Sequence, residues 1–304
     1  MADATITEPA GRSGAHTVLV MLWRDKFALM AVLYLLLMVL CAILGPALLG
    51  DAATALDLRM RNAAPFSFDK GWLFVLGADA LGRSILARLV VAAQNTIAIA
   101  AAAVVVSFTV GATLGIVAGY VGRWVDNLIM RFADILMSFP SLLMAMVVLY
   151  ILEPRVANLV IVLAITRLPI YIRTARAEVL EIRERMFVSA ATAMGASNLR
   201  IVLRHIAPVT LPTLITIATI DFAFVMLAES ALSFLGIGIQ PPEVTWGLMV
   251  AQGRNYLNTA WWLAFFPGLA IMLATLSLNL LSSWLRVVTD PTQRWRLEVG
   301  GRKP

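Results

Sequence analysis

The sequence predicts an all-α polytopic membrane protein with six transmembrane helices. Hydrophobic residues make up 61% of the 304 residues and charged residues only 14%, and the mean hydropathy is +0.86. A soluble domain carries roughly a quarter charged residues, so the composition excludes that class. Six apolar stretches approach the roughly 20 residues with which a helix crosses a bilayer. They are Phe27–Leu49, Thr96–Val121, Ile135–Leu152, Val156–Ile172, Thr210–Leu227 and Trp261–Leu285.

The chain divides into four regions around these stretches. Residues 1–26 are a predicted cytoplasmic tail without the apolar h-region of a signal peptide, and the first apolar run is too long for one. Residues 27–93 hold the first transmembrane helix and an external loop. Residues 94–287 form a core of five further helices with a cytoplasmic loop at 173–209, and residues 288–304 form a second cytoplasmic tail.

Small residues repeat on one face of the second span. Gly111, Gly115 and Gly119 recur every four residues, a spacing that permits another helix to approach closely. We expect this face to pack against a helix rather than to line a pore. The third and fourth spans are short and are interrupted by Pro140 and Pro169.

Two carboxylates lie in or beside the fifth span. Asp221 is inside the stretch and Glu229 follows its outer end. A carboxylate at membrane depth is costly and usually faces a cavity or a partner. Both are therefore candidates for the pathway or for a subunit interface. The structural alternative pairs Asp221 with a neighbouring helix and makes Glu229 the cap of a turn.

The external loop contains a stretch with helical periodicity. Residues 79–94 predict an amphipathic helix at the membrane interface, with Arg83 and Ser84 directed away from its apolar stripe. Such a helix would either cover a translocation path or simply lie on the lipid surface. The stripe consists of Leu81, Ile85, Leu89 and Ala92.

A polar, basic segment at 189–212 is built as a docking element. We expect a short helix over Arg183–Met194, a stop at Gly195, and a second short helix over Asn198–Ile206 capped by Ser197. Pro208 should prevent much continuation. The apolar side of the first helix holds Met186, Phe187, Ala190, Ala191 and Met194. Two helices with a tight corner would form a rigid plug for a partner's groove; the alternative is an ordinary amphipathic surface loop.

The lysine and arginine distribution orients the chain. With the N-terminus inside, 17 of the 24 basic residues fall on the inner side and seven on the outer side. This asymmetry favours cytoplasmic termini and a cytoplasmic docking segment. The seven outer residues are Arg59, Arg61, Lys70, Arg83, Arg88, Arg155 and Arg254.

Several classes of site are missing from the sequence. Cys41 is the single cysteine, which excludes a disulfide framework and a thiolate metal cluster. The net charge of +6 is carried by residues that flank apolar runs, so lipid head groups explain it better than nucleic acid. The residues offer no metal-ligand cluster and no catalytic arrangement around His16 or His205. No Gly-Lys pair exists, so a phosphate-binding loop is excluded and energy must come from another chain.

The docking segment resembles the cytoplasmic coupling loop of ABC importer permeases. That pattern is Glu-Ala-Ala, three residues, Gly, nine residues and His-x-x-Pro. Ser189 stands at the glutamate position, and the matching residues are Ala190, Ala191, Gly195, His205 and Pro208.

The external loop and the later blocks resemble the C-type permeases of dipeptide and oligopeptide importers. The similarity runs from about Leu76 to Pro291 in family order, although a Gly-x-Arg of the family is replaced around Ala92–Gln94. Matching residues include Leu76, Gly77, Asp79, Leu81, Gly82, Arg83, Leu86, Arg88, Gly119, Tyr120, Gly122, Asp126, Met130, Arg131, Asp134, Ser138, Pro140, Leu142, Arg173, Arg176, Leu180 and the run from Glu229 to Gly247.

The resemblance implies an ABC type I importer permease fold in the bacterial inner membrane. It implies a homologous B-type permease, two cytosolic ATPase subunits or one fused chain, an extracytoplasmic peptide-binding protein, and ATP with Mg²⁺ on the partners rather than on this non-catalytic chain. Asp79, Gly82 and Arg83 become a candidate external gate. The coupling residues implied are Ser189, Ala190, Ala191, Gly195, Ala196, Leu199, Arg200, His205 and Pro208.

Other functions stay open. A related importer for nickel or another small solute would share the fold. A secondary transporter would need its own coupling-ion site and an internal repeat, neither of which the sequence displays. An intramembrane enzyme would need a reactive pair at membrane depth, and Asp221 has no second aspartate in a span.

Overall fold

The computed structural model describes residues 14–68, 71–153 and 155–289. Within these ranges the chain is helical, and its one β contact is an isolated bridge between Ala78 and Ser84. The all-α prediction is confirmed. Most of the predicted tail at 288–304 and residues 1–13 lie outside the described residues.

The helices follow one another with short connections. In chain order they are α1 (Gly14–Arg24), α2 (Lys26–Thr54), η1 (Leu58–Met60), η3 (Trp72–Leu76), α3 (Ile85–Val121), α4 (Arg123–Met137), α5 (Ser141–Leu152), α6 (Val156–Ile182), α7 (Met186–Ala193), α8 (Asn198–Ile201), η4 (Val202–Ile206), α9 (Ala207–Phe234), α10 (Trp246–Gly253), η5 (Arg254–Tyr256) and α11 (Trp262–Thr289).

Five helices of the described chain are long and apolar enough to cross a membrane, and the count is six when one bent helix pair is taken as a single span. The bent pair is α4 with α5, which meet at 85° around Pro140. The interruption that the sequence predicts at Pro140 within the span Ile135–Leu152 is confirmed, because proline lacks the amide that would continue α4. The interruption predicted at Pro169 is wrong, because that proline lies inside α6 without ending it.

The external amphipathic helix predicted at 79–94 is also wrong. Its second half is the first part of α3, which starts at Ile85 and continues unbroken to Val121. The Ser84 hydroxyl oxygen accepts a hydrogen bond from the Ala87 amide at 3.1 Å and caps the helix. Asp79 and Leu81 lie before this cap in a turn. Nothing after Ser84 interrupts the helix, so the interfacial segment and the second span are one element.

The packing role predicted for the glycine face of α3 is confirmed. A Cβ added at Gly111 would lie 2.6 Å from the Tyr171 Cβ, and one at Gly119 would lie 2.8 Å from the Val179 Cβ. At Gly115 an added Cβ would overlap the backbone of α6 at Ile172. These three positions let α3 and α6 meet nearly backbone to backbone.

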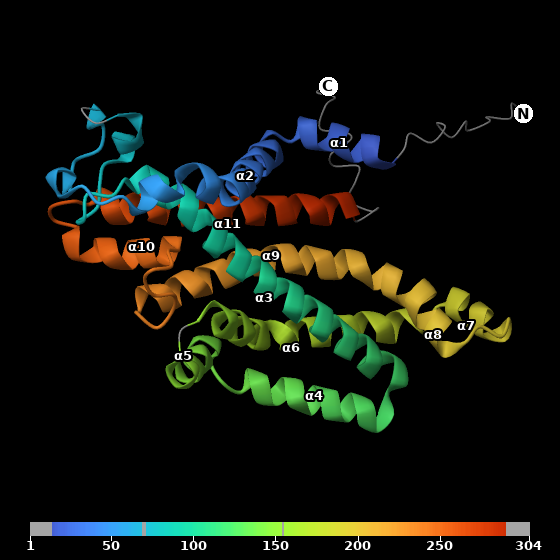
Figure 1. Ribbon diagram of the computed structural model, residues 1–304. Helices are drawn as coiled ribbons and strands as arrows, with labels where there is room; N and C mark the ends of the chain where they lie inside the picture. Colours follow the sequence, from blue (N-terminus) through green and yellow to red (C-terminus); the bar gives the residue numbers. More distant parts are fainter. Residues whose placement is uncertain (1–13, 69–70, 154, 290–304) are drawn as a thin grey trace, which may run out of the picture.

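The helices are arranged so that the molecule has two distinct ends (Figure 1). The α7–α8 corner, α1 and the end of α11 lie toward one end. The segment between α2 and α3 and the short helix α10 lie at the other. Met21 of α1 and Ala28 at the start of α2 are buried together with Trp284 and Val288 of α11, which ties α1 to this end of the molecule. The cytoplasmic placement of the termini and of the docking segment stays a prediction.

Candidate functional site

The α7–α8 corner forms as a glycine-terminated helix end. α7 is shorter than the predicted helix, running Met186–Ala193, and Gly195 adopts φ +82°. The Gly195 amide donates to the Thr192 carbonyl at 3.0 Å and the Ala196 amide to the Ala191 carbonyl at 3.1 Å. These two bonds define a Schellman motif, in which a glycine takes the left-handed conformation at least cost. The predicted stop at Gly195 is confirmed.

The second predicted helix does not end near Pro208. Ser197 precedes α8 at the N-cap position, although its side chain makes no capping bond. The chain then passes through a π-helical turn over Val202–Ile206 and directly into α9. In that turn the Ala207 amide donates to the Val202 carbonyl, five residues back. The wider turn accommodates the proline that follows it, so α8 and the membrane helix α9 are one continuous element.

The corner is anchored to α6 and α3. Val188 and Ile201 are buried in a cluster that includes Val179 and Ile182 of α6. The Tyr120 hydroxyl at the end of α3 donates to the Asn198 side chain at 3.0 Å. The corner is therefore held by apolar contacts and by a polar contact to a second transmembrane helix.

The outward face of the corner is apolar. Four large side chains are mostly exposed there: Met186 at 88%, Met194 at 82%, Leu199 at 69% and Leu203 at 62%. We call residues 186–203 the docking corner. Exposed methionine and leucine at the tip of a membrane protein fit contact with another protein.

The predicted coupling residues divide by their burial in this corner. Ala191 is buried, and Ala196 and His205 are half-buried. The exposed members are Ser189, Ala190, Gly195, Leu199, Arg200 and Pro208. Leu203 was missed, and its helical spacing from Leu199 was the available signal. The predicted apolar side of the first docking helix does not face one way, because Ala191 is buried whereas Met186 and Met194 are exposed.

Two ion pairs join α4 to α6. Arg176 donates to Asp126 at 2.6 Å, and Arg173 donates to Asp134 at 2.6 Å. All four residues belong to the family resemblance, but their pairing was not predicted.

At the other end, Asp79 organises a tight turn before α3. Its Oδ1 accepts from the amides of Leu81 and Arg83, each at 2.9 Å. Its Oδ2 accepts from Arg83 Nε at 2.7 Å and Arg88 Nη1 at 2.6 Å. Gly82 has φ +76°, and an added Cβ would overlap the Asp57 carbonyl. The three candidate gate residues thus form one compact turn rather than a helix.

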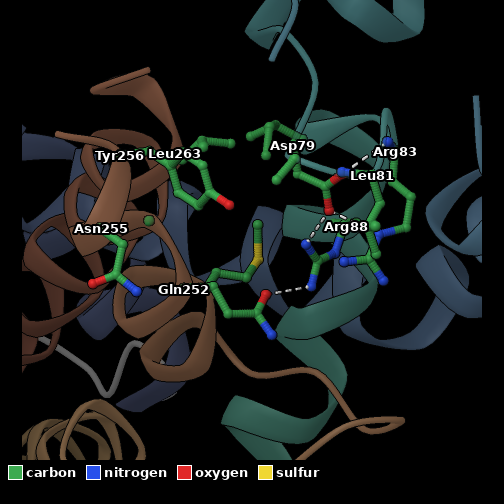
Figure 2. A pocket seen from close by; sticks show the side chains of 12 residues that line it. Asp79, Leu81, Arg83, Arg88, Gln252, Asn255, Tyr256 and Leu263 are labelled. Atoms are coloured by element: carbon green, nitrogen blue, oxygen red, sulfur yellow. Dashed lines mark hydrogen bonds and ion pairs between the residues drawn. The ribbon is translucent and has the colours of Figure 1, made fainter. Parts of the chain in front are cut away.

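A pocket of about 360 Å³ lies against this turn. One wall consists of Asp79, Arg83 and Arg88, which we call the ion cluster (Figure 2). The opposite wall comes from α10 and η5, and there the Gln252 Oε1 accepts from Arg88 Nη2 at 3.0 Å. Arg88 is only 6% exposed. Arg88 belongs to the family resemblance, but its link to Gln252 was not predicted, because α3 and α10 are far apart in the chain.

Asp221 and Glu229 are both buried within the chain. Asp221 is 1% exposed and forms an ion pair with Arg167 of α6, whose Nε donates at 3.1 Å. The Arg167 guanidinium also lies 4.2 Å from the Phe224 ring centroid. Glu229 is fully buried and accepts from the Ser233 hydroxyl at 2.8 Å. The ion pair matches the structural alternative for Asp221. Glu229 lies inside α9 and accepts from Ser233, whose own hydroxyl oxygen accepts from the Ile239 amide of the following turn, so Glu229 does not itself cap that turn. The role of both residues in the pathway stays a prediction.

Comparison with known proteins adds a family and a fold. The family model described as binding-protein-dependent transport system inner membrane component matches residues 111–295. A putative peptide transport system permease protein of Brucella suis is 40% identical and is aligned over 92% of this chain and 91% of its own. The di/tripeptide transport system permease protein DppC of Pseudomonas aeruginosa is 39% identical over 88% of each chain.

A further relative and a solved structure are similar over much of the chain. The dipeptide transport system permease protein DppC of Alkalihalophilus pseudofirmus is 36% identical over 89% of this chain and 88% of its own. A chain of the MetNI methionine ABC transporter, solved in inward-facing conformations, superposes with a TM-score of 0.54. It is 20% identical and covers 67% of this chain and 97% of its own, so the likeness concerns the fold.

Proposed function

Because the chain belongs to the family of binding-protein-dependent transport system inner membrane components, we propose that it is a permease subunit of an ATP-driven importer for dipeptides and oligopeptides. The observation that carries the substrate class is the series of relatives named as peptide, dipeptide and di/tripeptide permeases, each matched over about nine-tenths of its length. Peptide import is the function that these relatives favour.

The chain supplies half of the pathway and one coupling element. A homologous B-type permease supplies the other half, and an extracytoplasmic binding protein delivers the peptide. Two cytosolic ATPase subunits, or one fused chain, bind ATP and Mg²⁺. The chain lies in the bacterial inner membrane with both termini in the cytoplasm, an orientation supported by its basic residues.

The docking corner is the proposed contact with an ATPase subunit. Its exposed apolar residues suit a groove on that partner, and its buried residues Val188 and Ile201 tie it to α6. A displacement of α8 passes to the membrane through the unbroken path into α9. ATP-driven movement of the partner would thereby tilt a helix that carries Asp221.

Reconstitution tests the proposal. The affinity-tagged chain is purified from its native membrane with its partners, placed in proteoliposomes with the binding protein, and supplied with a radiolabelled tripeptide. We expect peptide uptake only when ATP is present on the side of the membrane that the ATPase subunits face. The matched control is the same complex with the phosphate-loop lysine of the ATPase replaced, which should abolish uptake.

The other functions give different results in this assay. ATP-dependent uptake of Ni²⁺ without peptide uptake would assign the chain to a nickel importer. Peptide uptake by the lone chain, driven by an ion gradient and indifferent to ATP, would identify a secondary transporter. Either outcome would contradict the proposal.

A further inference from the structure

We infer that the pocket beside the ion cluster binds a carboxylate, and that its ligand is the C-terminal carboxylate of the transported peptide. This inference rests on the proposed function, since it takes the substrate to be a peptide. It concerns a position on this chain where substrate is held before it enters the membrane path.

Charge is the first argument. Arg83 and Arg88 share a single carboxylate, that of Asp79, and among the residues that the structure describes no other charged side chain lines the pocket. The lining therefore carries one excess positive charge. Arg88 has 7% of its side chain exposed and Arg83 has 23%, so water screens this charge only in part. An anion in the pocket would compensate it.

The Asp79 carboxylate lines the same pocket and could be expected to repel an anionic ligand, but its hydrogen bonds prevent this. Both of its oxygens already accept two hydrogen bonds each, from two amides and two guanidinium groups. Its negative charge is therefore directed into the turn and toward the two arginines. The N–H groups of Arg83 and Arg88 that do not bind Asp79 belong to planar guanidinium groups. The forked geometry of such a group matches the two oxygens of a carboxylate.

The opposite wall supplies polar groups of its own. The oxygen of the Gln252 side chain is occupied by Arg88, which leaves its amide nitrogen as a donor. In Figure 2 the side chain of Tyr256 extends from the other wall with its hydroxyl end toward the ion cluster. A carboxylate between these walls would meet donors from both sides.

Apolar residues complete the pocket for an amino-acid ligand. Leu81, Ile85, Met249 and Leu263 line it beside the polar groups. The volume of about 360 Å³ falls within the range of small-ligand sites. Inorganic anions need no apolar wall, whereas the last residue of a peptide has a side chain to bury next to its carboxylate. Every peptide carries this terminus, so the site would serve substrates of different sequence.

The experiment compares peptides that differ only at this group. Uptake of a radiolabelled tripeptide and of its C-terminal amide is measured at subsaturating concentration in proteoliposomes holding the complete importer. Arg83→Gln should lower uptake of the free acid about tenfold and leave amide uptake nearly unchanged, since a charge-assisted contact is lost only for the acid. The acid-to-amide ratio is compared between variants, so a preference of the binding protein cancels.

Two further variants separate charge from structure. Arg83→Lys keeps the positive charge and should retain most of the acid preference. Tyr256→Phe leaves the ion cluster intact and should lower the ratio about threefold, which tests the pocket even if Arg83→Gln fails to assemble. Arg61→Gln is the matched control, because Arg61 is an exposed arginine of the same loop outside the pocket lining.

The outcomes are distinct. Peptide uptake whose acid-to-amide ratio is unchanged in Arg83→Gln and Tyr256→Phe would overturn the inference while leaving the proposed function intact. An equal loss of acid and amide uptake would also overturn it, and would indicate that Arg83 contacts the binding protein. If the unaltered importer transported neither peptide, the proposed function would fail, and the inference with it.

Discussion

The seam between α3 and α6 gives the sharpest stability prediction. A Cβ at Gly115 would overlap the Ile172 carbonyl oxygen, and it would lie 2.7 Å from the Ala175 Cβ and 3.1 Å from the Arg176 amide nitrogen. Non-bonded carbon atoms are at ease at roughly 3.5–4.0 Å, so the helices must separate by about 1 Å at this point. The obstructing atoms are mostly backbone and cannot rotate away.

Gly115→Ala should therefore destabilise the chain by about 2–3 kcal/mol, the upper part of the range for overpacked cores. The assay is reversible unfolding in mixed detergent micelles, followed by tryptophan fluorescence. Gly268→Ala is the matched control, because that glycine is also inside a helix but a Cβ there meets nothing within 4 Å. It should be neutral or stabilising by about 0.5 kcal/mol. Equal stability of the two variants would refute the close packing of α3 on α6.

Two other predictions concern orientation and the buried ion pair. In a Cys41→Ala background, single cysteines at the exposed positions Leu58 and Ser189 should react with an impermeant thiol reagent from opposite sides of the membrane; reaction from one side would refute the topology. Asp221→Asn should destabilise the chain by about 3 kcal/mol, because it leaves the Arg167 cation unpaired at membrane depth. The double variant with Arg167→Gln should recover most of that loss in the same unfolding assay, and additive losses would show that the two residues do not interact.

Apolar length and glycine spacing predicted much of the fold. A span needs about 20 apolar residues whatever its neighbours, so α2, α6 and α11 could be located from composition alone. The glycine repeat predicted a close helix contact for the same reason, although the sequence did not identify α6 as the partner. Both signals are local to one segment.

The errors arose where one segment joins the next. Ser84 caps the start of α3, and the sequence contains no break between that cap and the apolar span, so the prediction of a separate interfacial helix was wrong. Pro208 is tolerated because the π turn before it supplies room, a backbone adjustment that residue types do not reveal. Pro140 has the opposite effect, because no such turn precedes it.

The candidate sites were predictable only in part. The docking corner could be identified because Gly195 and its flanking helices are contiguous in the chain. The pairs Arg167 with Asp221 and Arg88 with Gln252 join distant segments. One sequence contains no signal for such pairing beyond the cost of burying a charge.

The measurement that tests the account most directly is peptide-stimulated ATPase activity of the reconstituted importer carrying Gly195→Val. At φ +82° a β-branched residue is strained by about 2 kcal/mol, while the space around an added Cβ is open, so the change acts on the angle of the corner rather than on packing. We predict that the variant inserts normally but loses stimulation and uptake. Gly195→Asn, which tolerates the left-handed conformation better, should keep most of both. Full stimulation and full uptake with Gly195→Val would contradict the assignment of the docking corner as the coupling element.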